Sequence, residues 1–372
     1  MKDIFNGTNI PALSVREAVD RLAEAYVTVI NNGLGVFWLP AIMLWGSPGI
    51  GKSNLTYQVA EKIEQLTGKR VVVTDVRLLL FNPIDLRGIP TANEDRTLAV
   101  WLRPKIFQMD ESKDVINILL LDELTACPPS VQAAAYQITL DRTVGEHKLP
   151  DNCIVIAAGN KTTDKSVSYK MPKALANRLC HIEIEANFAS WTKWARSHNI
   201  HYKVIDFLSA RRDYFMAFDA NRDDLAFPTP RSWEMVSKLL AVYNGDVESA
   251  YPLIAGCVGS GVATDFRIWC KVYNQLPDVE DIFAGKRPQR PTEPDALFAL
   301  VSVMLAYARE HSNDTQMISN AIDYSEKLPP DFSVSFMKEL INMEKDYRSF
   351  IIGLPAYRRW MDRKGRYFNG ID

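Results

Sequence analysis

The chain has 372 residues, of which 47% are hydrophobic and 24% are charged, and this composition is typical of a globular protein with two or three domains. A formal net charge of −2 gives no basic excess, which argues against nucleic acid and against a membrane surface as the main partner. The five cysteines are scattered without a CxxC pair, so we expect reduced thiols and a cytoplasmic location. The five histidines are not spaced for metal, so we expect no zinc site.

The first motif follows an apolar run at residues 34–45, LGVFWLPAIMLW. This run is too short to span a bilayer and contains Pro40, so we expect a loop that leads into a buried strand. Residues 46–53, GSPGIGKS, then match the pattern GxxxxGK[ST] in full, and a helical pattern follows that ends at Gly68. Strand, glycine-rich loop and helix together form the context in which backbone N–H groups and a helix N-terminus bind phosphate.

The residue types in this loop predict separate contacts with a nucleoside triphosphate. Its three glycines allow the backbone to curl around phosphate oxygens. Lys52 supplies a positive charge for the β- and γ-phosphates, and the Ser53 hydroxyl is an oxygen ligand for Mg²⁺. We expect ATP and Mg²⁺ to be bound by residues of the loop and of the next acidic motif, namely Gly46, Pro48, Gly49, Ile50, Gly51, Lys52, Ser53, Asn54 and Asp122.

Two acidic residues end a later apolar run, ILLLDE at residues 118–123. Four apolar residues in a row predict a strand buried on both faces of a parallel sheet, and ligands bind beyond the carboxyl ends of such strands. Asp122 is expected to hold Mg²⁺ through water, together with Ser53, and Glu123 to orient and polarise the attacking water as a general base. The alternative is a solvated acidic turn, which the position of the pair after a phosphate-binding loop disfavours.

A third apolar run, CIVIAAGN at residues 153–160, ends in Asn160. The amide of Asn160 can lie between the attacking water and the γ-phosphate. Considered alone, Asn160 fits a simple strand-end turn equally well. The order of loop lysine, acidic pair and strand-end asparagine favours the site.

These motifs together resemble those of the AAA+ ATPases and, within them, the MoxR-like branch of the AAA_5 type. GSPGIGKS resembles Walker A, ILLLDE resembles Walker B and Asn160 resembles sensor 1. The resemblance runs from about residue 12 to about residue 245. It implies an α/β fold of the P-loop NTPase kind, an αβα sandwich with a parallel sheet, followed by an α-helical lid and further C-terminal helices.

The same resemblance assigns roles to two arginines. Residues 171–184, MPKALANRLCHIEI, resemble the segment with the arginine finger, which places Arg178 at the ATP of a neighbouring subunit. The residues on either side of this arginine differ from those of many relatives, and Arg142 is a second candidate for the same role. Residues 227–233, FPTPRSW, resemble sensor 2, in which Arg231 starts a lid helix and reaches the γ-phosphate of its own subunit.

We expect three domains: an α/β nucleotide-binding domain at 1–185, an α-helical lid at 186–285 and a C-terminal helical extension at 286–372. In the first domain, residues 85–107 resemble the helix-2 insert of this branch and residues 142–150 resemble the hairpin before sensor 1. Both inserts would face a partner, and plain surface loops are the alternative. From apolar spacing we expect helices at 127–140, 188–199, 202–218, 295–311 and 332–352.

The expected function is a ring-forming ATPase, a hexamer, that uses hydrolysis to remodel or assemble a protein partner as a chaperone does. The resemblance implies a partner that carries a von Willebrand factor A domain. Two alternatives stay open: a nucleic-acid motor or loader on the same ATPase core, and an ATP-gated scaffold with little turnover. The presence of Glu123 favours the enzyme over the scaffold.

Overall fold

The computed structural model describes residues 9–164, 169–273, 276–343 and 347–368. The chain divides into two compact units. The first, here called the α/β unit, comprises residues 1–194, 218–224 and 229–231, and the second, the helical unit, comprises residues 195–217, 225–228 and 232–372. None of the described helices combines the length and the apolar character that a membrane crossing requires.

The α/β unit is built on a six-stranded sheet in which every paired strand is parallel to its neighbour. The strand that precedes the glycine-rich loop lies inside the sheet, and the strand that ends in Asp122 is buried at every position. This confirms the predicted fold class. In spatial order the strands are β1 (Ala12–Ser14), β10 (Leu179–Glu185), β2 (Ala41–Trp45), β9 (Cys153–Gly159), β6 (Val115–Asp122) and β3 (Arg70–Arg77).

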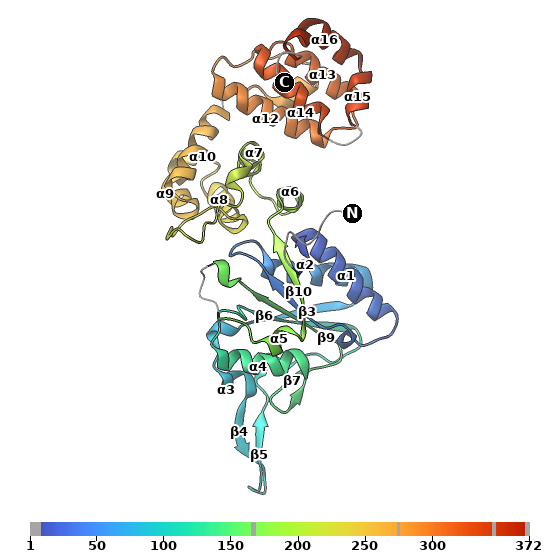
Figure 1. Ribbon diagram of the computed structural model, residues 1–372, viewed down its shortest axis with the longest axis vertical. Coiled ribbons are helices and arrows are strands. Elements are labelled where there is room, and N and C mark those ends of the chain that lie inside the picture. The colour runs from blue at the N-terminus through green and yellow to red at the C-terminus, as the bar shows by residue number, and fades with distance from the viewer. Residues whose placement is uncertain (1–8, 165–168, 274–275, 344–346, 369–372) are drawn as a thin grey trace. The chain divides into compact units, whose positions relative to one another are not determined.

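Helices cover both faces of the sheet (Figure 1). On one face, α1 (Val15–Asn31) and α2 (Lys52–Thr67) bury apolar side chains against the strands. On the other face a second core forms with α3 (Pro83–Arg87), α4 (Pro129–Leu140) and α5 (Lys173–Ala176). Because both faces are covered, the central strands β2, β9 and β6 are mostly apolar, with the buried Asn117 inside β6 and Asp122 at its end.

Two antiparallel hairpins interrupt this pattern, and Figure 1 shows one of them, β4–β5, projecting from the sheet. The hairpins contact each other, because His147 Nε2 lies 2.8 Å from the carbonyl oxygen of Trp101. They fall within the two predicted inserts. Their strands are β4 (Ile89–Ala92), β5 (Ala99–Leu102), β7 (Thr143–Val144) and β8 (His147–Lys148).

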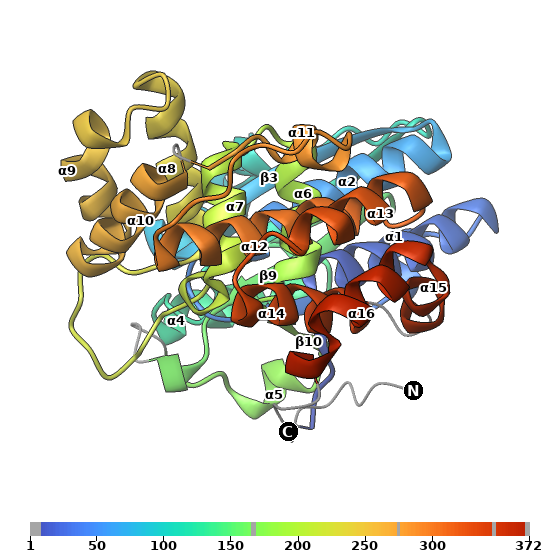
Figure 2. The same cartoon turned by 90° about the horizontal axis from the view of Figure 1, so that it is seen from above.

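The helical unit has two apolar centres. One is aromatic: Phe207 lies edge-on to Phe266, with ring centroids 5.1 Å apart, and Trp233 packs beside both. The other is formed by the helices from α11 onward, and Figure 2 shows α12, α14 and α16 side by side. The last part of the α/β unit and the helical unit contain α6 (Phe188–Ser197), α7 (Tyr202–Ala210), α8 (Pro230–Val242), α9 (Val247–Val258), α10 (Ser260–Tyr273), α11 (Val279–Phe283), α12 (Pro294–Glu310), α13 (Thr315–Ser325), α14 (Pro330–Ile341), α15 (Tyr347–Gly353) and α16 (Pro355–Phe368).

Two predicted helices were too long. The helix expected over 202–218 ends at Ala210, where tertiary bonds take over: Tyr214 accepts from Trp233 Nε1 at 2.7 Å and donates to Asp265 at 2.5 Å. The helix expected over 332–352 is divided between α14 and α15. The apolar spacing predicted neither break, because the same spacing of apolar residues continues across both breaks.

Candidate functional site

The glycine-rich loop leaves β2 and enters α2 in a conformation that needs its glycines. Gly49 and Gly51 have φ values of 76° and 106°, in the left-handed region that other residues rarely adopt. At Gly46 a Cβ atom would lie 2.9 Å from the Ile184 carbonyl oxygen, and at Gly49 it would lie 2.7 Å from Thr229 Oγ1. The loop is therefore shaped by close approaches that a side chain would block.

Lys52, the first residue of α2, turns its ammonium group back into the loop. Nζ donates to the carbonyl oxygens of Gly46 at 2.7 Å and Ser47 at 3.1 Å. It also donates to Oδ1 of Asn160 at 2.8 Å. The loop lysine and the asparagine at the end of β9 thus meet directly, although 108 positions separate them.

The surroundings of Lys52 lower its pKa, so a bound anion would change the fraction of the lysine that is charged. Burial lowers the pKa of Lys52 to about 8, while the carboxylates of Glu123 and Asp122 act in the opposite direction and Arg231 lowers the pKa slightly further. Desolvation disfavours the ammonium form, and a nearby negative group would favour it again. A phosphate at this place would therefore stabilise the charged lysine.

Ser53 and Asp122 bring two oxygen ligands together from different elements. Ser53 Oγ, in the first turn of α2, donates to Asp122 Oδ2 at the end of β6 over 2.7 Å. The other carboxylate oxygen, Oδ1, accepts from the backbone N–H of Glu123 at 2.9 Å. Asp122 is buried, so its orientation is fixed by these two bonds.

Glu123 has a backbone conformation that is unusual for its residue type. Its φ is 57°, and such values in residues other than glycine occur preferentially at functional sites. The chain on either side is fixed by backbone bonds, since Leu124 N–H donates to the Ala158 carbonyl at 2.9 Å and Ala126 N–H donates to Glu123 at 3.0 Å. Glu123 is thus held immediately beyond the end of β6.

Thr125 holds Asn160 in place and was missed by the sequence analysis. Its hydroxyl accepts from the Asn160 backbone N–H and donates to the Asn160 carbonyl, both at 3.0 Å. Thr125 is buried, and Gly159 permits the approach, because a Cβ atom there would lie 2.7 Å from Thr125 Oγ1. The available signal was a threonine two positions after the acidic pair.

The two candidate inter-subunit arginines are bonded differently. The Arg178 guanidinium lies 4.1 Å from the centre of the Tyr136 ring, and within the described chain its buried Nη1 has no hydrogen-bond partner. Arg142 Nη2 donates to the carbonyl of Cys153. Among the described residues, no hydrogen bond joins either arginine to Lys52 or Asp122. Arg178 thus keeps unused donors, whereas Arg142 bonds its own chain.

The remaining predicted residues lie around the loop. The Arg231 backbone N–H donates to the Gly49 carbonyl at 3.2 Å, so the first residues of α8 are joined to the loop, while the Arg231 residue itself is exposed. Ile50 is buried in the core below. Asn54 is exposed, and its Oδ1 accepts from Gln58 at 2.5 Å. Pro48 forms part of the loop turn.

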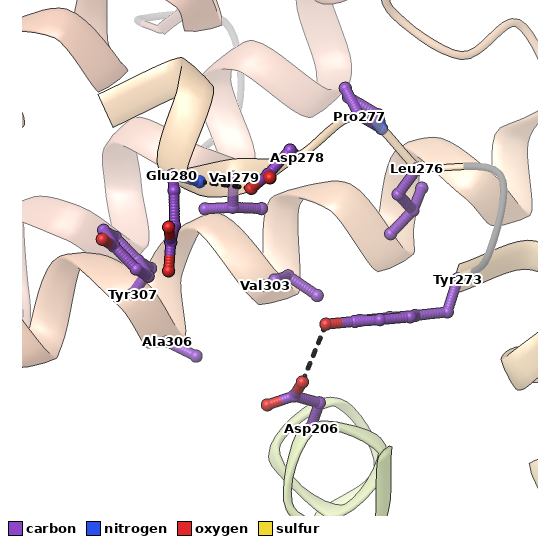
Figure 3. Close-up of a pocket in the computed structure, with 10 residues that line it drawn as sticks. All are labelled: Asp206, Tyr273, Leu276, Pro277, Asp278, Val279, Glu280, Val303, Ala306 and Tyr307. Atoms are coloured by element: carbon purple, nitrogen blue, oxygen red, sulfur yellow. Dashed lines mark hydrogen bonds between the residues drawn. The ribbon is translucent and has the colours of Figure 1, made fainter. Parts of the chain in front are cut away.

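A cavity of about 330 Å³ lies within the helical unit (Figure 3). Figure 3 shows the Tyr273 hydroxyl directed at the Asp206 carboxylate, to which it donates at 2.9 Å. Burial and the Asp206 carboxylate raise the pKa of Tyr273 above its ordinary value. On the opposite side, Asp278 accepts from the backbone N–H of Glu280 at 2.9 Å and so begins α11. None of the described residues that line the cavity is lysine or arginine.

Three solved structures illustrate how the chain compares with known folds. A RuvB mutant from Thermotoga maritima is 15% identical with a TM-score of 0.37, and the alignment covers 78% of this chain and 84% of that one. A putative ATPase from Cytophaga hutchinsonii is 13% identical with a TM-score of 0.33, over 82% and 83%. Hsp104 with ATPγS and FITC casein is 15% identical with a TM-score of 0.36, over 65% and 44%. Because these TM-scores are low, the fold is identified by the sheet topology and not by the similarity to these three structures.

A family comparison bears on the site itself. No curated protein matches the chain. Residues 41–181 match the family described as "ATPase family associated with various cellular activities (AAA)". This segment, less than half of the chain, contains the glycine-rich loop, the acidic pair, Asn160 and Arg178. The part of the chain that builds the candidate site is therefore similar to the AAA family of ATPases.

Proposed function

We propose that this protein is a Mg²⁺-dependent ATPase of the MoxR-like AAA+ branch, which assembles into a ring and remodels or assembles a protein partner. The observation that carries the proposal is the convergence of Lys52, Ser53, Asp122 and Asn160 at one edge of the sheet through two side-chain hydrogen bonds. Lysine, hydroxyl, carboxylate and amide in this order are the groups that a P-loop ATPase uses on a nucleoside triphosphate.

The residues present fit a magnesium ion. Mg²⁺ is usually bound by one or two protein oxygens together with phosphate oxygens and water, and Ser53 Oγ and Asp122 Oδ2 already lie 2.7 Å apart. These two residues would hold the ion. Once bound, the ion would supply positive charge that polarises the phosphoryl group.

The chain's own residues then have distinct tasks. Lys52 would exchange its bonds to the loop carbonyls for bonds to phosphate oxygens. The negative charge of the phosphate would stabilise the ammonium form of Lys52, which burial disfavours. Glu123, held beyond β6, would orient the attacking water and accept its proton. Asn160, fixed by Thr125, would hold that water against the phosphate. Arg231, which is joined to the loop through its backbone at the start of α8, would contact the γ-phosphate and so link α8 to the bound nucleotide.

A neighbouring copy would complete the site. Arg178 is the better candidate for this contribution, because its Nη1 is unpaired within the described chain, whereas Arg142 is bonded to Cys153. An arginine that acts between subunits requires a ring or another assembly in which each copy meets the next. A hexameric ring and a cytoplasmic location are part of this proposal.

The exposed residues of the two hairpins favour a protein as the partner on which the ATPase acts. Ile89, Leu98 and Leu102 on the β4–β5 hairpin are 64%, 67% and 57% exposed, and exposed apolar groups on a projecting element favour protein contacts. The β7–β8 hairpin contacts the first hairpin through His147, so the two would present one surface. We propose that the partner carries a von Willebrand factor A domain.

Phosphate release and nucleotide binding test the enzymatic proposal together. Glu123→Gln should lower steady-state phosphate release by about 10²- to 10⁴-fold and leave ATP affinity within a few fold, because only the base is removed. Glu111→Gln, at an exposed position of the same unit, is the matched control and should match the wild type. Equal rates for wild type and Glu123→Gln would end the claim of catalysis. ATP-dependent assembly without turnover would then identify a nucleotide-gated scaffold.

A further inference from the structure

His181 lies at the centre of a hydrogen-bonded chain that the proposed catalytic roles do not use. Trp45 Nε1 donates to His181 Nδ1 over 2.9 Å, and His181 Nε2 lies 2.7 Å from the carbonyl oxygen of Ala176. The Trp45 and His181 rings also stack, with centroids 5.9 Å apart and planes inclined by 29°. An indole N–H can only donate and a carbonyl can only accept, so His181 accepts at Nδ1 and donates at Nε2. Both bonds together require a single neutral tautomer.

The two ends of this chain belong to different parts of the proposed machinery. Trp45 is the last residue of β2 and directly precedes Gly46, whose carbonyl accepts from Lys52. Ala176 is the last residue of α5 and precedes Arg178 by two positions. The chain of bonds therefore connects the base of the phosphate loop with the segment that carries the proposed inter-subunit arginine.

Backbone pairing and apolar packing both hold the Arg178 segment. The strand that follows it, β10, pairs with β2 from Leu179 and Ala41 onward. The buried side chains of Leu175 and Leu179, on either side of Arg178, pack in the same apolar cluster as Trp45. The guanidinium itself lies over the Tyr136 ring, and its Nη1 has no hydrogen-bond partner in the described chain. Apolar packing tolerates small shifts, whereas a hydrogen bond fixes distance and direction. The ladder between β10 and β2 thus holds the chain after Arg178, and the polar link from His181 to Ala176 is suited to set the position of the residues before it.

We propose that His181 is a positioning residue, which through Trp45 and Ala176 holds the Arg178 segment in register with the phosphate loop of the same subunit. The arginine that one subunit offers to the next would then depend on the conformation of the first subunit's own loop. This inference rests on the proposed function, since it assumes that Arg178 acts between subunits. The loop is held by elements at both ends, the interior strand β2 and the long helix α2, whereas the Arg178 segment joins the paired strand β10 at one end and the four-residue α5 at the other. Loss of His181 should therefore displace the arginine segment more than the loop.

An experiment that mixes two inactive variants tests the two ends of this chain of hydrogen bonds separately. Lys52→Met subunits lack the phosphate-binding lysine but retain Arg178, and Arg178→Ala subunits have the reverse defect. Each variant alone should be nearly inactive, and a mixture should recover phosphate release, because the first variant supplies its arginine to sites of the second. Adding His181→Ala to the Lys52→Met subunit should lower the recovered rate by about tenfold, the value of roughly one hydrogen bond in the transition state. Adding it to the Arg178→Ala subunit should retain most of that rate.

Two further variants and two readouts keep the inference open to refutation. His181→Gln keeps one acceptor and one donor and should restore most of the recovered rate, whereas Trp45→Phe in the Lys52→Met subunit should lower it. Equal loss from both placements of His181→Ala, or a loss matched by a fall in melting temperature, means that His181 serves only the fold and overturns the inference. If the mixture with intact His181 recovers nothing, Arg178 does not act between subunits. The proposed trans arginine then fails, and the inference fails with it.

Discussion

Carboxylates line two places in this molecule, and their partners differ. In the α/β unit, Asp122 is bonded by Ser53 and by the Glu123 backbone, and Lys52 lies close enough for the carboxylates to oppose the fall in its pKa. In the cavity of the helical unit, Asp206 is bonded by the Tyr273 hydroxyl and Asp278 by the backbone at the start of α11. The described lining of that cavity contains no cationic side chain.

The difference follows from how each region is built. A parallel sheet brings the carboxyl ends of distant strands to one edge, so polar side chains from separate sequence motifs gather there with bonds that a ligand can replace. The helical cavity lies where α7, α10, α11 and α12 meet, and there Asp278 caps a helix while Asp206 pairs with a buried phenol. We expect the first cluster to bind and react, and the second to support the fold.

The largest effect expected from this contrast concerns Arg178. Arg178→Ala should lower phosphate release by about 10³- to 10⁵-fold, because an arginine supplied at the transition state typically contributes that much. Arg142→Ala is the matched control: its guanidinium is bonded to Cys153, so the variant should lose thermal stability and keep its rate per folded protein within a few fold. A reversed pattern would make Arg142 the acting arginine.

Lys52→Met tests whether the first cluster is a binding site at all. Removing one charged donor should weaken ATP binding by about 10- to 150-fold, the equivalent of 1.5–3 kcal/mol for a hydrogen bond to a charged group. Lys62→Met, on the same helix, removes a lysine that is paired with Asp20 at 2.5 Å and should leave the affinity unchanged. Titration with a fluorescent ATP analogue measures both. Equal affinities of the wild type and Lys52→Met would mean that the cluster beside the phosphate loop, like the helical cavity, is not an ATP-binding site.

The pH dependence of ATP affinity should report Lys52 alone. In the free protein its pKa is about 8, so the lysine is mostly charged below that pH and loses its proton above it. Bound phosphate favours the charged form, and affinity should therefore be flat below pH 8 and fall by up to about tenfold per pH unit above it. Calorimetry should show proton uptake on binding in this upper range. The slope should vanish in Lys52→Met, and a slope that persists there would assign it to another group.

Much of the α/β unit could be predicted because its information is local in the sequence. Apolar runs gave the central strands, and the residues that end them gave Asp122, Glu123 and Asn160. Thr125 and His181 escaped because their partners are distant: Thr125 bonds Asn160 from 35 positions away, and His181 bonds Trp45 from 136. No short motif encodes such pairs, since the sheet creates them.

The helical unit was less predictable for a related reason. Apolar spacing located its helices, but tertiary bonds such as that of Trp233 with Tyr214 decided where α7 ends. The cavity depends on the packing of four helices and left no sequence signal that we recognised. The expected domain limits at residues 185 and 285, the catalytic roles and the AAA_5 type stay predictions.

The smallest expected effect tests the structural side of the comparison. Tyr273→Phe removes the hydroxyl that Asp206 accepts and should cost about 1 kcal/mol of stability, a fall of about 2–4 °C in the melting temperature of a unit of this size. ATP hydrolysis should stay within twofold, since no catalytic group is touched. Tyr202→Phe, at a residue that is 54% exposed, keeps its ring contacts with His201 and Tyr273, and as the control it should change neither quantity. If Tyr273→Phe instead altered hydrolysis tenfold at an unchanged melting temperature, the cavity would be functional, and its carboxylates would belong with those beside the phosphate loop.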